Sequence, residues 1–141
     1  MLVETDAGFD EFIEQCQCRE LKLAVTSSSD RPSLLFKLSR GVVAHSRLVT
    51  DLEETFPVIV SCDDVQRKKP DPECYLKTAS LLGVAPAECI VLEDTPSGVL
   101  AAKRAGMACI AVPNDYTVHA DLSQADHVAP SFIGAIEALG W

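Results

Sequence analysis

Three polar clusters in this sequence contain residue types that could together bind a phosphate group and a divalent cation. Each lies downstream of a short apolar run, and in chain order they are Thr26-Ser27-Ser28, Lys68-Lys69-Pro70 and Glu93-Asp94. Hydroxyl and backbone N–H groups bind phosphoryl oxygens, a lysine neutralises their charge, and carboxylates are the hard oxygen ligands that Mg²⁺ requires. Taken singly, each cluster is more typical of a turn, a solvated loop or a helix N-terminus. The functional interpretation therefore depends on whether the fold brings the three clusters together.

Helical and strand patterns alternate along the whole chain, which indicates an α/β fold. The predicted helices cover residues 9–19, 30–40, 70–82, 96–105 and 131–139, and the predicted strands cover 21–26, 57–60, 89–92, 108–112 and 127–129. Strands that are apolar throughout and separated by helices are typical of a mostly parallel sheet covered on both faces. Such sheets bind ligands beyond the carboxyl ends of their strands, so we expect the three clusters at one edge of the sheet.

Capping residues predict where several helices begin and end. Asp30 is expected to cap the second helix, which Gly41 then ends, while Gly83 and Gly106 are expected to end the third and fourth helices.

Length and charge exclude several classes of function. The chain has 141 residues, 48% of them hydrophobic, and a formal net charge of -9. These values favour one globular domain over residues 1–141 and disfavour binding to nucleic acid or to an anionic membrane. No apolar run is long enough to cross a membrane, and the N-terminus does not resemble a signal peptide, so we expect a cytoplasmic protein with reduced cysteines.

The order of these motifs resembles the haloacid dehalogenase superfamily, and within it the β-phosphoglucomutase and small-molecule phosphatase branch. The resemblance runs from about Gly8 to the C-terminus. The segments that carry it are Lys22–Ser29, Lys69-Pro-Asp-Pro72 with Tyr75, Val91-Leu-Glu-Asp-Thr-Pro-Ser-Gly98 and Ala105-Gly106-Met107. The resemblance implies a three-layer αβα Rossmann-like core with a mostly parallel sheet. It also implies that Ser27 and Lys69 are catalytic, that Glu93 and Asp94 bind Mg²⁺, and that the ligand is phosphate or a phosphorylated small molecule.

The family's first motif, D-x-D-G, does not occur in this sequence. Its first Asp is the nucleophile of the family, and covalent phosphoryl transfer cannot proceed without that carboxylate. We therefore expect a core truncated at its N-terminus, without the first strand and the cap domain, and with little or no activity alone. Glu4 and Asp6 could be a decayed first motif, and Cys62 is a weak candidate for a substitute nucleophile.

A missing first strand would leave a slot between the strands at 21–26 and 89–92. Unpaired backbone groups in such a slot are unfavourable, so something must close it. We consider three hypotheses: the flanking strands pair directly, Met1–Thr5 occupies the slot, or another chain supplies the contact.

Three functions remain open from the sequence. The chain could be an enzyme-derived core that retains part of a phosphatase or phosphomutase site. It could be a non-catalytic binding or scaffold module that self-associates, as a homo-oligomer, or is completed by a partner chain. It could also be a working hydrolase that uses Glu4 and Asp6 or a different nucleophile.

Overall fold

The structure is a computed structural model of the chain that describes residues 8–141. Within this range two parallel sheets form. Strand β1 (Ala24–Thr26) pairs with β2 (Val58–Val60), and Val25 lies opposite Ile59. The second sheet has the order β3-β4-β5, formed by β3 (Ile90–Glu93), β4 (Ala108–Ala111) and β5 (His127–Val128). The prediction of an α/β fold with parallel strands is confirmed.

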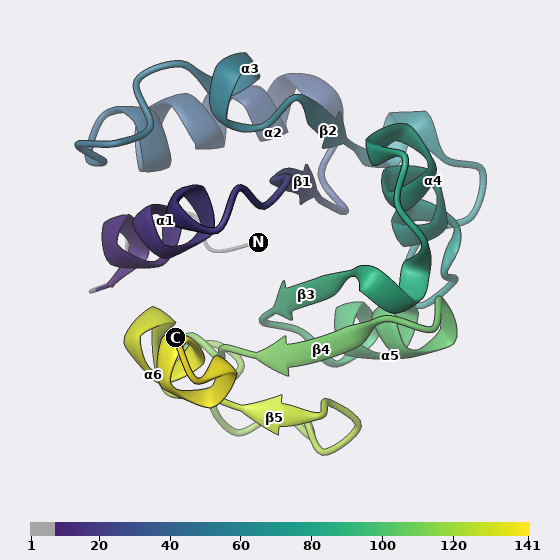
Figure 1. Cartoon of the computed structure of the whole chain (residues 1–141). Coiled ribbons are helices and arrows are strands. Elements are labelled where there is room, and N and C mark those ends of the chain that lie inside the picture. Colours follow the sequence, from purple (N-terminus) through teal and green to yellow (C-terminus); the bar gives the residue numbers. More distant parts are fainter. Residues whose placement is uncertain (1–7) are drawn as a thin grey trace.

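The described chain contains six α-helices, which lie before, between and after the strands (Figure 1). They are α1 (Phe9–Cys18), α2 (Arg31–Lys37), α3 (Leu52–Thr55), α4 (Glu73–Leu82), α5 (Pro96–Arg104) and α6 (Phe132–Leu139). Helices α4 and α5 pack against a core that includes Val60, Val91 and Cys109 from the strands. None of these helices is long and apolar enough to cross a membrane.

Helix α1 joins the two sheets. Its Phe12 and Cys16 pack in one apolar cluster with Phe132 of α6 and Ile110 of β4, and its Ile13 packs in another with Val25 of β1. Figure 1 shows α1 lying between α2 on one side and α6 on the other. The relative position of the two sheets is therefore set in part by one amphipathic helix.

The hypothesis that the strands flanking the slot pair directly is wrong, because β1 and β3 belong to different sheets. Among residues 8–141, β1 pairs with β2 alone and β3 with β4 alone. The hypothesis that Met1–Thr5 fills the slot concerns residues outside the described range. Contact with another chain stays a prediction.

The prediction that Gly41 ends the second helix is also wrong. The helix continues beyond Lys37 as a wider π-helical segment, Leu38–Val43, in which Gly41 is buried. A glycine ends a helix by adopting a positive φ, as Gly83 does at 69° after α4, but Gly41 is not among the glycines with positive φ. The predicted cap of α2 is present, since the Asp30 carboxylate accepts a hydrogen bond from Ser33 N at 2.9 Å.

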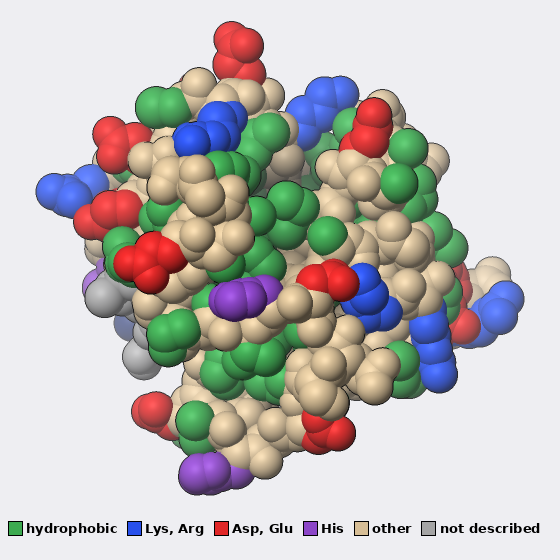
Figure 2. All heavy atoms as spheres, turned by 60° about the horizontal axis from the view of Figure 1, so that its bottom comes forward, with side chains coloured by type: hydrophobic (Ala, Val, Ile, Leu, Met, Phe, Trp, Pro, Cys, Tyr) green, Lys and Arg blue, Asp and Glu red, His purple; other side chains and the backbone are tan. Residues whose placement is uncertain are grey.

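The surface carries charges of both signs. On the face shown in Figure 2, Lys and Arg side chains of the described residues lie singly among acidic ones and form no continuous basic patch.

Candidate functional site

A pocket of about 320 Å³ opens where the carboxyl ends of β1 and β3 face each other. It takes its walls from the loop after β1, the end of α2, the loop before α4 and the end of β3. The lining residues are Ser27, Ser28, Ser29, Lys37, Lys69, Glu93, Asp94 and Thr95. The structure thus brings together Ser27, Lys69, Glu93 and Asp94, which are distant in sequence.

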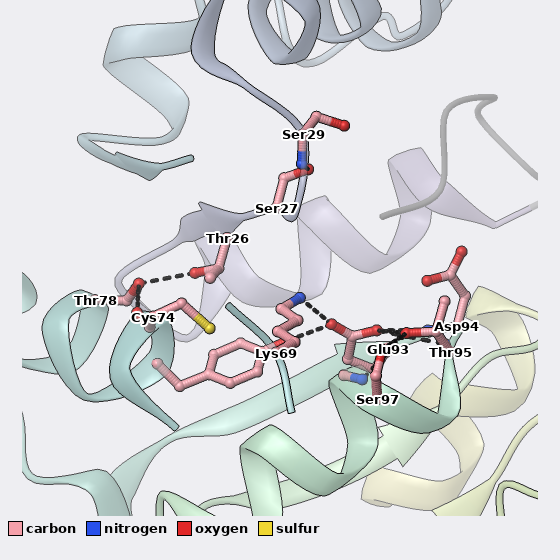
Figure 3. A network of polar contacts seen from close by, with 12 residues as sticks. Thr26, Ser27, Ser29, Lys69, Cys74, Thr78, Glu93, Asp94, Thr95 and Ser97 are labelled. Carbon is pink, nitrogen blue, oxygen red and sulfur yellow. Dashed lines mark hydrogen bonds and ion pairs between the residues drawn. The ribbon is translucent and has the colours of Figure 1, made fainter. Parts of the chain in front are cut away.

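The serine loop continues the first sheet by one residue. Ser27 N donates to Val60 O at 2.9 Å, and the Ser27 hydroxyl accepts from Ser29 N at 3.1 Å. The side chain of Thr26 lies on the other side, where its hydroxyl is 2.8 Å from that of Thr78 (Figure 3). Of the predicted Thr-Ser-Ser cluster, the two serines line the pocket and the threonine packs against α4.

Lys69 and Glu93 form a buried ion pair in the floor of the pocket. Lys69 Nζ donates to Glu93 Oε1, and the two side chains are only 6% and 3% exposed. Tyr75 also donates its hydroxyl hydrogen to Glu93 Oε1, and Lys69 Nζ lies 4.8 Å from the centroid of the Tyr75 ring. Two donors and the face of an aromatic ring therefore hold this pair in place.

The second oxygen of Glu93 is bound by the start of α5. Glu93 Oε2 accepts from Asp94 N at 3.1 Å, from Thr95 N at 3.4 Å and from the Thr95 hydroxyl at 3.3 Å. Thr95 also caps the helix, because its hydroxyl accepts from Gly98 N at 3.1 Å. Both carboxylate oxygens of Glu93 are thus engaged by donors of the protein itself (Figure 3).

These contacts determine the charge state of Glu93. Burial, the largest contribution, raises its pKa, but the Lys69 charge and the hydrogen bonds from Lys69 and Tyr75 act in the opposite direction, and the pKa is lowered from its ordinary value. The pKa of the Tyr75 hydroxyl is raised well above its ordinary value by burial and by the negative charge of Glu93. At neutral pH, Glu93 is a carboxylate and Tyr75 a neutral hydrogen-bond donor.

Asp94 faces the pocket from the end of the same strand and is 5% exposed. Its Oδ2 accepts from Asn114 Nδ2 at 2.9 Å, and the side-chain Oδ1 of Asn114 accepts from Tyr116 N at 2.8 Å. The sequence did not single out Asn114 as a site residue. Asn114 follows β4 and lies at the same edge of the sheet as Asp94, and this position could have predicted it as a site residue.

Lys37 is a second site residue that the sequence did not identify. It lies at the end of α2, lines the pocket and donates from Nζ to the Ser29 hydroxyl at 2.9 Å. A lysine in the last turn of a helix is usually explained by the helix dipole, so its residue type gave no sign of this position.

The number of carboxylates at the pocket, those of Glu93 and Asp94, is compatible with a Mg²⁺ site. Among residues 8–141 no three His, Cys, Asp or Glu side chains gather closely enough to hold a metal ion. Protein sites for Mg²⁺ nevertheless use only one or two carboxylates, together with waters and phosphate oxygens. Asp94 on the pocket wall, beside the carboxylate of Glu93, is a donor set of that kind.

The short helical turn after β2, Cys62–Asp64, has structural contacts. Asp64 accepts from Ser61 N at 2.7 Å, and Asp63 accepts from Arg31 N at 2.8 Å. Cys62 lines a small hollow beside the pocket together with Cys74, and its thiol lies 4.0 Å from Asp63 Oδ1. Glu4 and Asp6 lie outside the described residues.

Comparisons with known proteins agree with this geometry. A sequence model of the family described as "Haloacid dehalogenase-like hydrolase" matches residues 2–112. The chain is 38% identical over 120 residues to validoxylamine A 7'-phosphate phosphatase of Streptomyces hygroscopicus subsp. limoneus, covering 84% of this chain and 51% of the relative. It is also 38% identical over 106 residues to phosphorylated carbohydrates phosphatase of Thermotoga maritima, covering 75% of this chain and 45% of the relative.

A similar solved structure is CbbY from Rhodobacter sphaeroides in complex with phosphate. The TM-score is 0.78 at 33% identity, with 89% of this chain and 53% of that chain covered. The chain spans about half the length of the curated relatives it matches.

Proposed function

Because this chain belongs to the haloacid dehalogenase-like hydrolase family, we propose that its pocket binds the phosphoryl group of a small phosphorylated molecule together with Mg²⁺. One observation supports this proposal above the others: Ser27, Lys69, Glu93 and Asp94, from three separate segments, line a single pocket. Hydroxyl, ammonium and carboxylate groups in one pocket are the parts that a phosphate and its metal require.

Each residue has its own part in this proposal. The Ser27 hydroxyl and the backbone N–H groups of its loop bind phosphoryl oxygens, and Lys69 contributes positive charge beside them. Asp94 binds the metal directly. Glu93 holds Lys69 in place and adds negative charge next to the metal, because its own oxygens are occupied by donors of the protein. Asn114 orients Asp94.

When bound, Mg²⁺ would supply charge neutralisation and orientation for the phosphoryl oxygens. The residues of this chain do the rest: they bind the anion, exclude water from the buried Lys69–Glu93 pair and fix the direction of the Asp94 carboxylate. Phosphoryl transfer by a covalent route also needs a nucleophilic carboxylate. The sequence contains no D-x-D-G, so we propose that these 141 residues alone turn over phosphate esters little or not at all.

The relatives suggest the class of ligand. One is named validoxylamine A 7'-phosphate phosphatase and another phosphorylated carbohydrates phosphatase, and the similar CbbY structure is a complex with phosphate. A phosphorylated carbohydrate fits the pocket volume of about 320 Å³ better than a macromolecule does.

A calorimetric titration tests this function. Phosphate is expected to bind the wild-type chain more tightly in the presence of MgCl₂ than in its absence, and Asp94→Asn is expected to abolish that difference. Asp121→Asn, which changes an exposed Asp bonded to Ser123, is the control and should behave like wild type. Phosphate binding that is unaffected by magnesium or by Asp94→Asn would contradict the metal site.

Hydrolysis of p-nitrophenyl phosphate separates the enzymatic alternatives. We expect no magnesium-dependent turnover above background for the 141-residue chain. Turnover that disappears in Asp94→Asn would instead support a working hydrolase with a different nucleophile.

The alternative of a binding or scaffold module that self-associates or is completed by a partner is favoured by one observation. Among residues 8–141, β1 and β3 each pair on one side only, and a strand edge without a partner in this range is a site where another chain can pair. Sedimentation velocity over a range of concentrations tests the self-associating version, which predicts a dimer or larger species; a monomer at all concentrations would contradict it.

A further inference from the structure

Lys69 is bound at the tip of its side chain, while its backbone belongs to a loop. Its ammonium group donates to the Glu93 carboxylate in the floor of the pocket. Its backbone lies in the segment 65–72, which separates the short turn Cys62–Asp64 from the start of α4 and contains no helix or strand. A binding side chain on a loop is placed only as well as the loop that carries it. The contacts that fix this loop therefore affect the proposed phosphate site.

The carboxylate of Glu73 binds the first half of this loop. Its Oε1 accepts from Gln66 N at 2.8 Å, and its Oε2 accepts from Arg67 N at 2.9 Å. Glu73 is also the first residue of α4, so one side chain connects the first half of the loop to the helix that follows it. Hydrogen bonds to an ionised carboxylate are stronger than those between neutral groups. Lys69 lies in sequence between the two points that are connected.

The second half of the loop has contacts of its own. Asp71 N donates to Lys68 O at 3.0 Å, and the Asp71 carboxylate accepts from Glu73 N at 3.0 Å. Arg104, from the end of α5, donates to Pro70 O at 3.2 Å. None of these contacts uses the side chain of Glu73. Removal of that carboxylate is therefore expected to loosen the first half of the loop and to leave α4 in place.

A glutamate in the first turn of a helix also has a simpler explanation, which is a favourable interaction with the helix dipole. That interaction requires negative charge but no particular length of side chain. The observed bonds require, in addition, that both oxygens of Glu73 reach Gln66 N and Arg67 N. Substitutions that change charge and length separately can therefore distinguish the two explanations.

We propose that Glu73 is a positioning residue for phosphate binding, because it fixes the loop that places Lys69 beside Glu93. This inference rests on the proposed function, since it assumes that phosphate binds near Ser27 and Lys69. It predicts an effect opposite in sign to that of charge. Loss of a negative charge would by electrostatics alone tighten the binding of an anion. Loss of the loop contacts weakens it.

Calorimetry of phosphate binding in MgCl₂ tests the inference. Glu73→Ala is expected to weaken binding about 10-fold, the size typical of losing a group that orients a ligand-binding side chain. Glu73→Gln keeps the length and one acceptor oxygen, so its affinity should lie between those of wild type and Glu73→Ala. Glu73→Asp keeps the charge but is shorter by one methylene group, so it should bind as weakly as Glu73→Ala. Circular dichroism verifies that each variant is folded.

Glu88→Ala is the matched control. The Glu88 carboxylate also accepts from a backbone N–H, that of Ala85 at 3.2 Å, but it precedes β3 at the end opposite to Glu93. The substitution removes the same charge and a bond of the same kind. Glu88→Ala should bind phosphate like wild type.

Hydrogen exchange, followed by NMR without phosphate, examines the loop directly. The amides of Gln66 and Arg67 should be protected in wild type and lose protection in Glu73→Ala, while the amides of α4 stay protected. Unprotected Gln66 and Arg67 amides in wild type would overturn the inference. Loss of protection throughout α4 in Glu73→Ala would overturn it too, because the effect would then be one of helix stability.

The binding data can also contradict the inference. Wild-type affinity in Glu73→Ala or in Glu73→Asp would overturn it while leaving the phosphate site in place. Equal weakening in Glu88→Ala would overturn it as an effect that is not specific to this loop. If the wild-type chain binds no phosphate, the proposed function and this inference both fail.

Discussion

Gly98 lies directly against the carboxylate of Glu93. A Cβ atom at position 98 would overlap the carboxyl carbon and both oxygens of that side chain. The first turn of α5 can approach the end of β3 this closely only because residue 98 has no side chain. The same approach lets Thr95 donate to Glu93 and cap the helix at once.

The first prediction concerns this contact. Gly98→Ala should lower the free energy of unfolding by about 1–3 kcal/mol, because the added methyl group displaces the buried carboxylate. Urea unfolding measures the change, and Ser97→Ala on the exposed side of the same turn is the control. In an open helix the same substitution stabilises by roughly 1 kcal/mol, so a more stable Gly98→Ala variant would contradict the close approach.

The second prediction concerns the buried ion pair. Lys69→Met should cost about 3–5 kcal/mol, because Glu93 is left buried without its cation. The double variant Lys69→Met/Glu93→Gln should recover much of this loss, since no unpaired charge remains. For comparison, Lys103→Met breaks the more exposed pair with Asp126 and should cost at most about 1 kcal/mol. Similar losses in the two single variants would show that the Lys69–Glu93 pair is hydrated.

The third prediction concerns pH. The pKa of Glu93 in the folded chain lies below its ordinary value of 4.5. Its contribution to stability is therefore complete above about pH 4.5 and is lost as the pH falls through the lower folded-state value. Glu93→Gln should reduce the decline in unfolding free energy with falling pH, measured with urea between about pH 6 and 3. Glu11→Gln, an exposed change on α1, should leave the decline as in wild type. If the unfolding free energy of wild type and of Glu93→Gln fell equally with pH, the prediction would be contradicted.

The fourth prediction concerns the thiols. All six cysteines are free, and Cys16, Cys74 and Cys109 are buried while Cys18 is exposed. Burial raises the pKa of Cys16 to about 11 and that of Cys109 to about 12. Since the thiolate is the reactive form, Cys18 should react first with an aromatic disulfide reagent and the buried thiols only after unfolding. Cys18→Ser should remove the fast phase, and rapid reaction of the buried thiols in the native chain would contradict this assignment.

Local rules of sequence predicted the elements well where one residue decides the conformation. Asp30 caps α2 and Gly83 ends α4 as expected, because a carboxylate and a residue without Cβ are suited to those backbone positions. Gly41 misled the prediction, because packing around the buried glycine continues the helix. The four-residue helix α3 was missed because so short a segment has no periodic pattern.

The candidate site was predictable to the extent that its residues follow strands. Ser27, Glu93 and Asp94 stand at strand ends, and parallel strands bring those ends to one edge. Lys37 was not predictable, because it reaches the pocket from a helix whose direction depends on tertiary packing. Pairing of β1 with β3 was wrongly considered, since apolar strands of similar composition do not reveal which neighbours they choose.

The pocket spans two sheets that share no backbone hydrogen bonds between β1 and β3, and α1 packs on both. Among residues 8–141, its width therefore depends in part on how the apolar side chains of α1, Phe12 and Ile13, fit against the two sheets. Shortening Ile13 or Phe12 would let the serine loop and the acidic end of β3 drift apart while leaving every polar group of the pocket intact. In this fold, selectivity for ligand size is a property that a distant hydrophobic contact can tune.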